Sequence, residues 1–169
     1  MRSLGKRPKN SMRIILLYAL NDTIFAARFR EEMIYITRRE RFNAAHKLYN
    51  ENWSKEKNDE VFGKCANANW HGHNFELIVT VKGGVDPETG FVMNLKMLSG
   101  IVKNEVIEKV DHKNLNLDVD FMKGKFASTE VLAMEFWKIL APKIEAEGAQ
   151  LHYIKLIETE NNYVEYYGE

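Results

Sequence analysis

The alternation of hydrophobic and polar residues predicts a pair of strands in the first half of the chain. Residues 34–42 (IYITRRERF) combine β-branched and aromatic residues with alternating charges, which is typical of a strand with one face in water. From His71 to Val81 the odd positions share one face of a second strand, and most of them are apolar. The polar stretch 50–60 between these strands is expected to be a loop or a short surface helix.

In the middle of the chain, the spacing of apolar residues predicts two helices. In residues 94–110 apolar side chains recur every three or four positions, and Asn94 is suited to cap the N-terminus of the helix. A second helix is expected from Ser128, another good cap, through Leu140. Pro142 leaves its later course open, because proline inside a helix kinks or ends it.

Two further strands are predicted at the C-terminus, over residues 152–159 and 163–167, with a tight turn at Asn161-Asn162. The order of elements is therefore β-β-α-α-β-β. Strands and helices in separate runs, joined by hairpins, predict an α+β fold with an antiparallel sheet. A chain of 169 residues is long enough for one such domain with a real hydrophobic core.

Charge separates the first 32 residues from the rest. They carry seven Lys/Arg and three acids, whereas the whole chain has no net charge, so neither nucleic acid nor a membrane is indicated as a partner. Basic residues followed by IILLYAL have the look of a signal peptide, but no clear cleavage site follows. We interpret residues 1–32 as an extension of uncertain order and residues 33–169 as the single domain. A lone cysteine and the lack of a long apolar run favour a cytoplasmic location.

Three histidines suggest a metal site. His71 and His73 lie two residues apart on a predicted strand, so both imidazoles project from one face. His46, at the end of the preceding strand, can supply a third nitrogen. Three neutral histidines with an open fourth position are typical of catalytic zinc. The H-x-H pair alone is a weak signal, since most such pairs are surface or packed histidines.

Other polar residues are candidates for proton transfer or binding. Cys65 next to zinc or an imidazolium can act as a base or nucleophile, although a free cysteine is more often a small buried hydrophobe. Asp111-His112 can form a proton carrier, or can be a helix-ending Asp beside a surface His. Glu158 extends an apolar row that includes His152, and a buried carboxylate needs partners such as ring N–H donors. We assign no role to His152.

The chain resembles the 6-pyruvoyl tetrahydropterin synthase family in an ordered set of motifs over residues 33–169. The motifs are FNAAH, FGKCANANWHGHNF, VDPETGFVMNL, VDHKNLNLDV, ASTE and IETENN-V-Y-GE. The resemblance implies a tunnelling fold, with a four-stranded antiparallel sheet and two helices on one face. It also implies a homo-oligomer, a hexamer built as a dimer of trimers, with active sites at subunit interfaces.

The resemblance also implies an activity. Such enzymes convert 7,8-dihydroneopterin triphosphate to 6-pyruvoyl-tetrahydropterin and eliminate triphosphate, a carbon–oxygen lyase reaction with one Zn²⁺ per subunit. Mg²⁺ is a candidate companion of the substrate triphosphate. The residues at the matching positions are the zinc ligands His46, His71 and His73, the catalytic residues Cys65, Asp111 and His112, and the pterin-binding residues Glu158, Thr129 and Glu130.

The main alternative is 6-carboxy-tetrahydropterin synthase of queuosine biosynthesis, a carbon–carbon lyase type that releases acetaldehyde. Three residues separate the cysteine from the H-G-H pair in those enzymes, whereas five do here, which favours the pyruvoyl product. Trp70 stands where a glycine is expected, and a bulky indole there can reshape the pocket. Cys65 argues against the folate branch, which has glutamate instead. A non-catalytic pterin-binding module and a Cys65-His71 thiol hydrolase are weaker interpretations.

Overall fold

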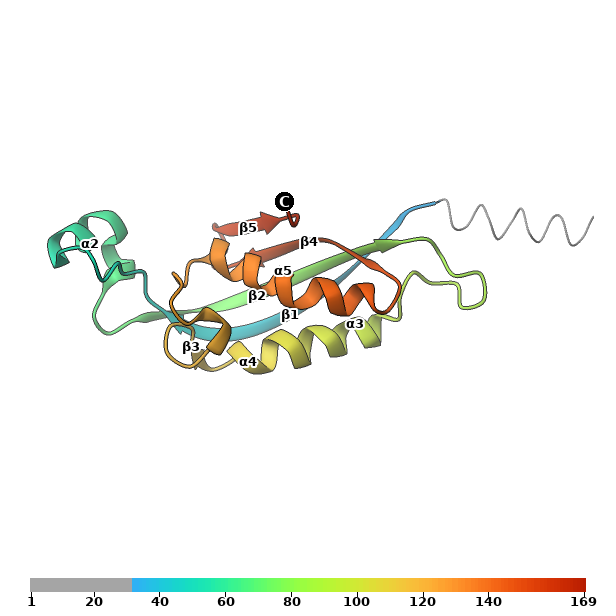
Figure 1. Ribbon diagram of the computed structural model, residues 1–169, viewed down its shortest axis with the longest axis horizontal. Helices are drawn as coiled ribbons and strands as arrows, with labels where there is room; N and C mark the ends of the chain where they lie inside the picture. The colour runs from blue at the N-terminus through green and yellow to red at the C-terminus, as the bar shows by residue number, and fades with distance from the viewer. Residues whose placement is uncertain (1–31) are drawn as a thin grey trace, which may run out of the picture.

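An antiparallel sheet forms the framework of the molecule (Figure 1). The computed structural model describes residues 32–169, so the expected N-terminal extension lies outside the described residues except for its last residue. Four strands run antiparallel to their neighbours, in the order β1 (Ile34–His46), β2 (His71–Gly83), β4 (Gln150–Ile157) and β5 (Tyr163–Tyr166). The predicted α+β architecture with two pairs of strands is therefore confirmed.

The sheet has one strand more than the four expected. β3 (Lys113–Asn114) pairs in parallel with Ala44 and Ala45 at the end of β1, which gives the order β3-β1-β2-β4-β5. A strand of two residues is too short to show a hydrophobic period of two, so the sequence pattern could not reveal it.

Two helical segments cover one face of the sheet (Figure 1). The first consists of α3 (Leu95–Val102), a π-helical turn over Lys103–Ile107 and α4 (Glu108–Val110). Asn94 caps it as predicted, because its side chain accepts a hydrogen bond from the backbone N–H of Lys96.

The second segment is α5 (Thr129–Glu145), which begins after the predicted cap Ser128. It continues three residues beyond Pro142 before it ends. The short helix α2 (Lys55–Phe62), in the stretch expected to be a loop or surface helix, projects from one end of the molecule (Figure 1). None of the helices in residues 32–169 is long and apolar enough to cross a membrane.

The hydrophobic core lies between the helices and the sheet. The row of odd-numbered residues on β2 is buried as predicted, and α5 covers it with its own apolar stripe. The core residues from these two elements are Phe75, Leu77, Val79, Val81, Leu132, Ala133, Phe136, Leu140 and Ile144. The same row of β2 continues toward one end of the sheet as His73 and His71, so the two histidines emerge where the core stops.

His152 does not join this buried row, contrary to the alternation read from the sequence. The pairing of β2 with β4 shifts between Thr80 and Val81, so that Leu151 takes the buried place opposite Val81. The His152 ring packs instead against aromatic rings, with its centroid 4.6 Å from that of Tyr35. His152 therefore has a packing contact in the structure and no assigned role in the site.

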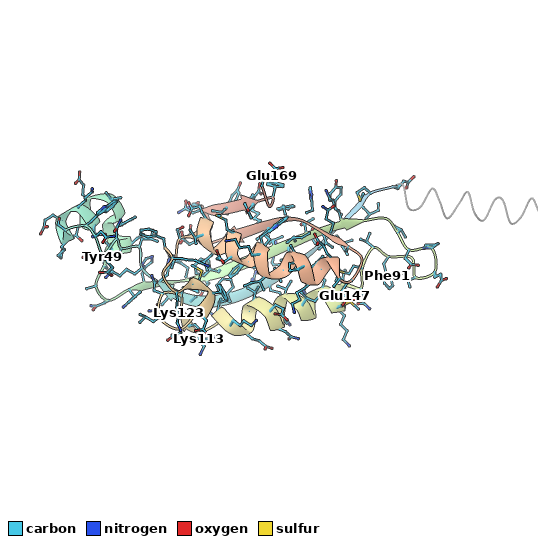
Figure 2. All side chains as sticks on the ribbon, viewed as in Figure 1. Tyr49, Phe91, Lys113, Lys123, Glu147 and Glu169 are labelled. Carbon is cyan, nitrogen blue, oxygen red and sulfur yellow. The ribbon has the colours of Figure 1, made fainter. Side chains whose placement is uncertain are left out.

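Gly168, near the C-terminus, packs closely against the side chain of Trp137 on α5. Gly168 has φ +84°, and a Cβ added there would overlap the indole of Trp137. Gly148 also has a positive φ, +81°, but open space around it. Figure 2 shows the end of the chain, marked by Glu169, beside the sheet.

We expect Gly168→Ala to lower the free energy of unfolding more than the matched control Gly148→Ala does. The control carries only the left-handed backbone penalty of about 1–2 kcal/mol. Gly168→Ala adds overlap with Trp137, for which overpacking typically costs about 1–3 kcal/mol more. Urea titrations followed by tryptophan fluorescence measure both losses, and equal losses would contradict the packing of Gly168 on Trp137.

Candidate functional site

The register of the first hairpin gathers three histidines at one end of the sheet. His46 pairs directly with His71, and Ala44 pairs with His73, so all three side chains leave the same face. The His46 ring centroid lies 4.4 Å from that of His71 and 5.2 Å from that of His73. One ring nitrogen from each histidine lies within 4.8 Å of the other two, which is close enough for a shared metal ion. The predicted cluster is therefore confirmed.

The hydrogen bonds and the lowered pKa values of the three histidines are suited to binding a cation. His46 Nδ1 lies 2.7 Å from the backbone carbonyl of Ala127, and because a carbonyl only accepts, Nδ1 carries the hydrogen. His46 Nε2 and both ring nitrogens of His71 are buried without a hydrogen-bond partner. Burial is the main cause that lowers the pKa of His46, His71 and His73 below the ordinary value. Neutral imidazoles are the form that binds metals, so these residues fit a metal ion.

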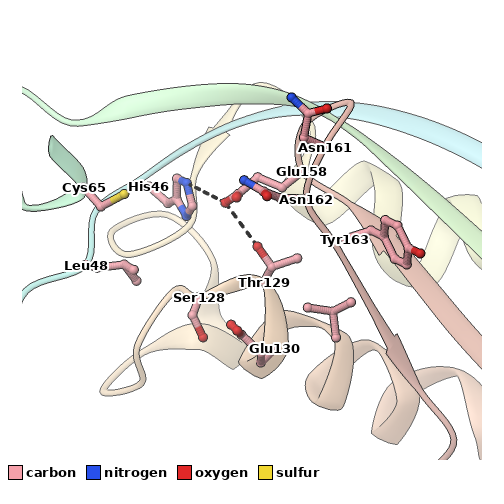
Figure 3. A pocket seen from close by; sticks show the side chains of 11 residues that line it. His46, Leu48, Cys65, Ser128, Thr129, Glu130, Glu158, Asn161, Asn162 and Tyr163 are labelled. Carbon is pink, nitrogen blue, oxygen red and sulfur yellow. Dashed lines mark hydrogen bonds and ion pairs between the residues drawn. The ribbon is translucent and has the colours of Figure 1, made fainter. Parts of the chain in front are cut away.

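A cavity of about 590 Å³ opens beside the histidines. Five of the residues singled out in the sequence line it: His46, Cys65, Thr129, Glu130 and Glu158 (Figure 3). They come from the end of β1, the loop before β2, the start of α5 and the turn after β4, which are far apart in the sequence. The fold thus brings the candidate base and the candidate pterin-binding residues to the metal cluster.

Cys65 reaches this cavity from a single 3₁₀ turn, Gly63–Ala66. Its backbone carbonyl accepts a hydrogen bond of 2.9 Å from the N–H of Leu48, which ties the turn to the chain just after His46. The side chain is partly exposed. The thiol is therefore accessible from the cavity.

Glu158 lies in the turn between β4 and β5, one residue beyond the end of β4, whereas the sequence pattern predicted a strand through residue 159. Its N–H donates to the carbonyl of Asn162. Its carboxylate Oε1 accepts a hydrogen bond of 3.1 Å from the hydroxyl of Thr129, the first residue of α5. The same oxygen is 3.4 Å from His46 Nε2 (Figure 3) and 3.8 Å from His73 Nε2. The half-buried carboxylate therefore accepts a hydrogen bond from Thr129 and lies close to two histidines of the cluster.

Asp111 and His112 form the expected pair, but they do not line the cavity that contains Cys65. Asp111 accepts a hydrogen bond of 2.8 Å from the backbone N–H of Asn43, and this bond is the largest cause that lowers the pKa of its carboxyl group. His112 Nδ1 lies 2.9 Å from the other carboxylate oxygen, and the imidazole is largely exposed. Within one chain, the pair is an exposed acid–histidine unit separate from the candidate base.

Trp70 has a backbone conformation that explains why glycine is expected there. Its φ is +65°, in the left-handed region that glycine adopts without strain. Its N–H donates to the carbonyl of Asn67 in the turn that leads to His71. The indole lines a second cavity of about 540 Å³ with Lys47 and Tyr49, and it does not line the cavity with Cys65. Within the described chain, the indole therefore borders a different cavity from the one that contains Cys65.

Two contributions to the site were not predicted from the sequence. The Ala127 carbonyl fixes the His46 tautomer, but a backbone acceptor leaves no signal in residue type. Asn161 and Asn162 line the cavity as well, and they were interpreted only as turn residues. Their amides are a signal that could have been used, because side-chain amides are common ligand-binding groups.

Comparisons with known proteins agree with these motifs. The sequence model of the family described as 6-pyruvoyl tetrahydropterin synthase matches residues 35–169. A Dictyostelium discoideum protein named 6-pyruvoyl tetrahydrobiopterin synthase is 43% identical over 136 residues, which are 80% of this chain and 97% of that protein. A putative 6-carboxy-5,6,7,8-tetrahydropterin synthase of Archaeoglobus fulgidus is 32% identical over 102 residues, which are 60% of this chain and 77% of that protein.

The fold has a solved counterpart. The structure of Caenorhabditis elegans 6-pyruvoyl tetrahydropterin synthase matches with a TM-score of 0.76 and 35% identity, and the match covers 82% of this chain and 97% of that one. The likeness confirms the predicted tunnelling fold.

Proposed function

The chain belongs to the 6-pyruvoyl tetrahydropterin synthase family, and from that premise we propose that it converts 7,8-dihydroneopterin triphosphate to 6-pyruvoyl-tetrahydropterin, with elimination of triphosphate. The observation that carries the proposal is the shared cavity. It places Cys65, Glu158 and Thr129 beside His46, whose Nε2 is buried without a hydrogen-bond partner.

The proposed metal ion is zinc, held by His46, His71 and His73. When bound, zinc would act as a Lewis acid toward the side-chain hydroxyls of the substrate and acidify the neighbouring C–H groups. The Ala127 carbonyl keeps the hydrogen of His46 on Nδ1 and so leaves Nε2 free for the metal.

The proposed roles of the remaining residues concern binding and proton transfer. Glu158 accepts hydrogen bonds from the N–H groups of the pterin ring, and Thr129 and Glu130 bind the ring from the start of α5. Cys65, as a thiolate, takes a proton from the substrate side chain. The ring gains the hydrogen that the side chain loses, so no separate redox cofactor is required.

The proposed proton donor is the Asp111–His112 pair of a neighbouring subunit in a homo-oligomer, for which the proposed form is a dimer of trimers. Its exposure and its position outside the Cys65 cavity support a role between subunits. Asp111 orients the imidazole, because its carboxylate is itself fixed by the Asn43 N–H.

The second candidate product is 6-carboxy-tetrahydropterin. The stretch between Cys65 and His71 favours the pyruvoyl product, since with Lys64 and Cys65 its five residues form two successive turns. The N–H of Asn67 donates to the Lys64 carbonyl, and the N–H of Trp70 donates to the Asn67 carbonyl. A stretch of three residues has no room for both turns, so it would place the cysteine differently.

The product decides between these functions. We expect mass spectrometry after incubation with 7,8-dihydroneopterin triphosphate to show 6-pyruvoyl-tetrahydropterin and triphosphate. Formation of 6-carboxy-tetrahydropterin with acetaldehyde would favour the second candidate. Recovery of unchanged substrate from the zinc-loaded, folded protein would refute both.

A further inference from the structure

The Glu158 carboxylate faces a histidine nitrogen that has no hydrogen to give. His46 holds its hydrogen on Nδ1, where it is donated to Ala127, so Nε2 presents a lone pair. Glu158 Oε1 lies 3.4 Å away and also offers only lone pairs. Two acceptors at this distance repel each other unless a positive charge lies between them, either a second proton on the imidazole or a bound cation. His46 is only 2% exposed, so water does not separate them freely.

Two of the three distances between Glu158 and the histidines suit a shared cation. Metal–ligand bonds of about 2.0–2.1 Å at tetrahedral angles place neighbouring ligand atoms about 3.4 Å apart. Oε1 is 3.4 Å from His46 Nε2 and 3.8 Å from His73 Nε2. Glu158 lies outside the set of residues whose ligand atoms are all within 4.8 Å of one another, so the carboxylate must move toward His71 to complete a four-ligand site. Thr129 holds this same oxygen through a hydrogen bond of 3.1 Å, so α5 positions the carboxylate toward the histidines (Figure 3).

This position conflicts with pterin binding. The ring N–H donors lie on the pyrimidine edge, whereas the reacting side chain is attached at the opposite end of the bicyclic ring. A carboxylate in contact with the histidine nitrogens cannot hold the pyrimidine edge while the substrate side chain lies beside the same nitrogens. Glu158 must therefore leave the cluster when the ring binds.

We propose that Glu158 is an exchangeable fourth metal ligand, which closes the site before substrate binds and is transferred to the pterin ring when it binds. The inference rests on the proposed function, because it takes the metal and the pterin ring from there. Recognition of the ring then opens a coordination position for the side-chain hydroxyls. The site thereby responds to pterins and stays closed to other hydroxyl compounds.

Metal affinity tests the ligand role without an activity assay. Competition with a chromophoric chelator gives the Zn²⁺ affinity of the full chain and of Glu158→Gln, which keeps the shape but weakens the oxygen as a ligand. We expect Zn²⁺ binding at least about tenfold weaker, since even residues that only support a ligand affect affinity 10–100-fold. The matched control is Glu130→Gln, which removes the same charge from the same cavity and should leave affinity within about twofold. Equal losses in the two variants would overturn the proposal.

Co²⁺ in place of zinc reports the exchange itself. We expect the visible absorption of the Co²⁺ protein to differ between the wild type and Glu158→Gln, and Thr129→Val to shift it toward the Gln variant. Addition of 7,8-dihydroneopterin, which lacks the triphosphate, should change the wild-type spectrum. Identical spectra of wild type and Glu158→Gln before the pterin is added would refute the fourth ligand. Failure of the wild type to bind either metal would instead refute the proposed function.

Discussion

Replacing His71 by alanine is expected to abolish tight metal binding and, with it, turnover. Both ring nitrogens of His71 are buried without a hydrogen-bond partner in the described protein, so this imidazole is suited to bind a metal ion. We expect the Zn²⁺ affinity to fall by more than about a hundredfold, because residues that merely support a ligand already account for 10–100-fold. Metal analysis after dialysis and chelator competition measure the loss.

Thermal unfolding separates this effect from misfolding. Buried polar atoms without partners destabilise a fold, so the metal-free His71→Ala protein should melt close to the metal-free wild type. Added Zn²⁺ should raise the melting temperature of the wild type and not that of His71→Ala. The matched control is His152→Ala, which removes a half-buried histidine that packs against Tyr35. Full metal occupancy in dialysed His71→Ala would refute the assignment of this ligand.

The metal cluster was predictable because it depends on local geometry. A period of two places His71 and His73 on one face, and a hairpin places the end of one strand opposite the start of the next. The observed pairing of His46 with His71 agrees with these two facts, although the long connection over residues 47–70 does not by itself fix the register. The two caps, Asn94 and Ser128, were predictable for a similar reason, since capping involves residues only two or three positions away.

The features that could not be predicted from the sequence depend on contacts between distant residues or on backbone conformation. The approach of Glu158 to His46 requires the packing of α5 against β4, because Thr129 holds the carboxylate in place. The pairing of β3 with β1 involves two residues without any pattern. The irregularity near His152 reverses the side of the sheet that simple alternation assigns to it. Trp70 was predictable in part. The sequence showed that a bulky residue occupies a position where glycine is expected, but it did not show that the backbone there has a positive φ.

Replacing Cys65 by alanine is expected to remove most of the turnover and to leave the metal in place. Cys65 lies on the loop before β2, whereas the three metal ligands lie on β1 and β2, so the cluster does not need the thiol. A positioned acid or base contributes about 10²–10⁴-fold to rate, and we expect a loss of kcat within this range. Steady-state kinetics with 7,8-dihydroneopterin triphosphate, together with zinc analysis of the same samples, measures both quantities.

The single cysteine of the chain makes a second, independent measurement possible. Alkylation with iodoacetamide modifies the thiol of Cys65, the one cysteine in the sequence. We expect alkylation to remove turnover and to leave Zn²⁺ bound, because Cys65 is not among the three residues that can hold the metal. Cys65→Ser should be as inactive as the alanine variant, since a hydroxyl does not ionise at neutral pH. Wild-type turnover in either variant would show that another group removes the proton, and the Asp111–His112 pair would then be the next candidate.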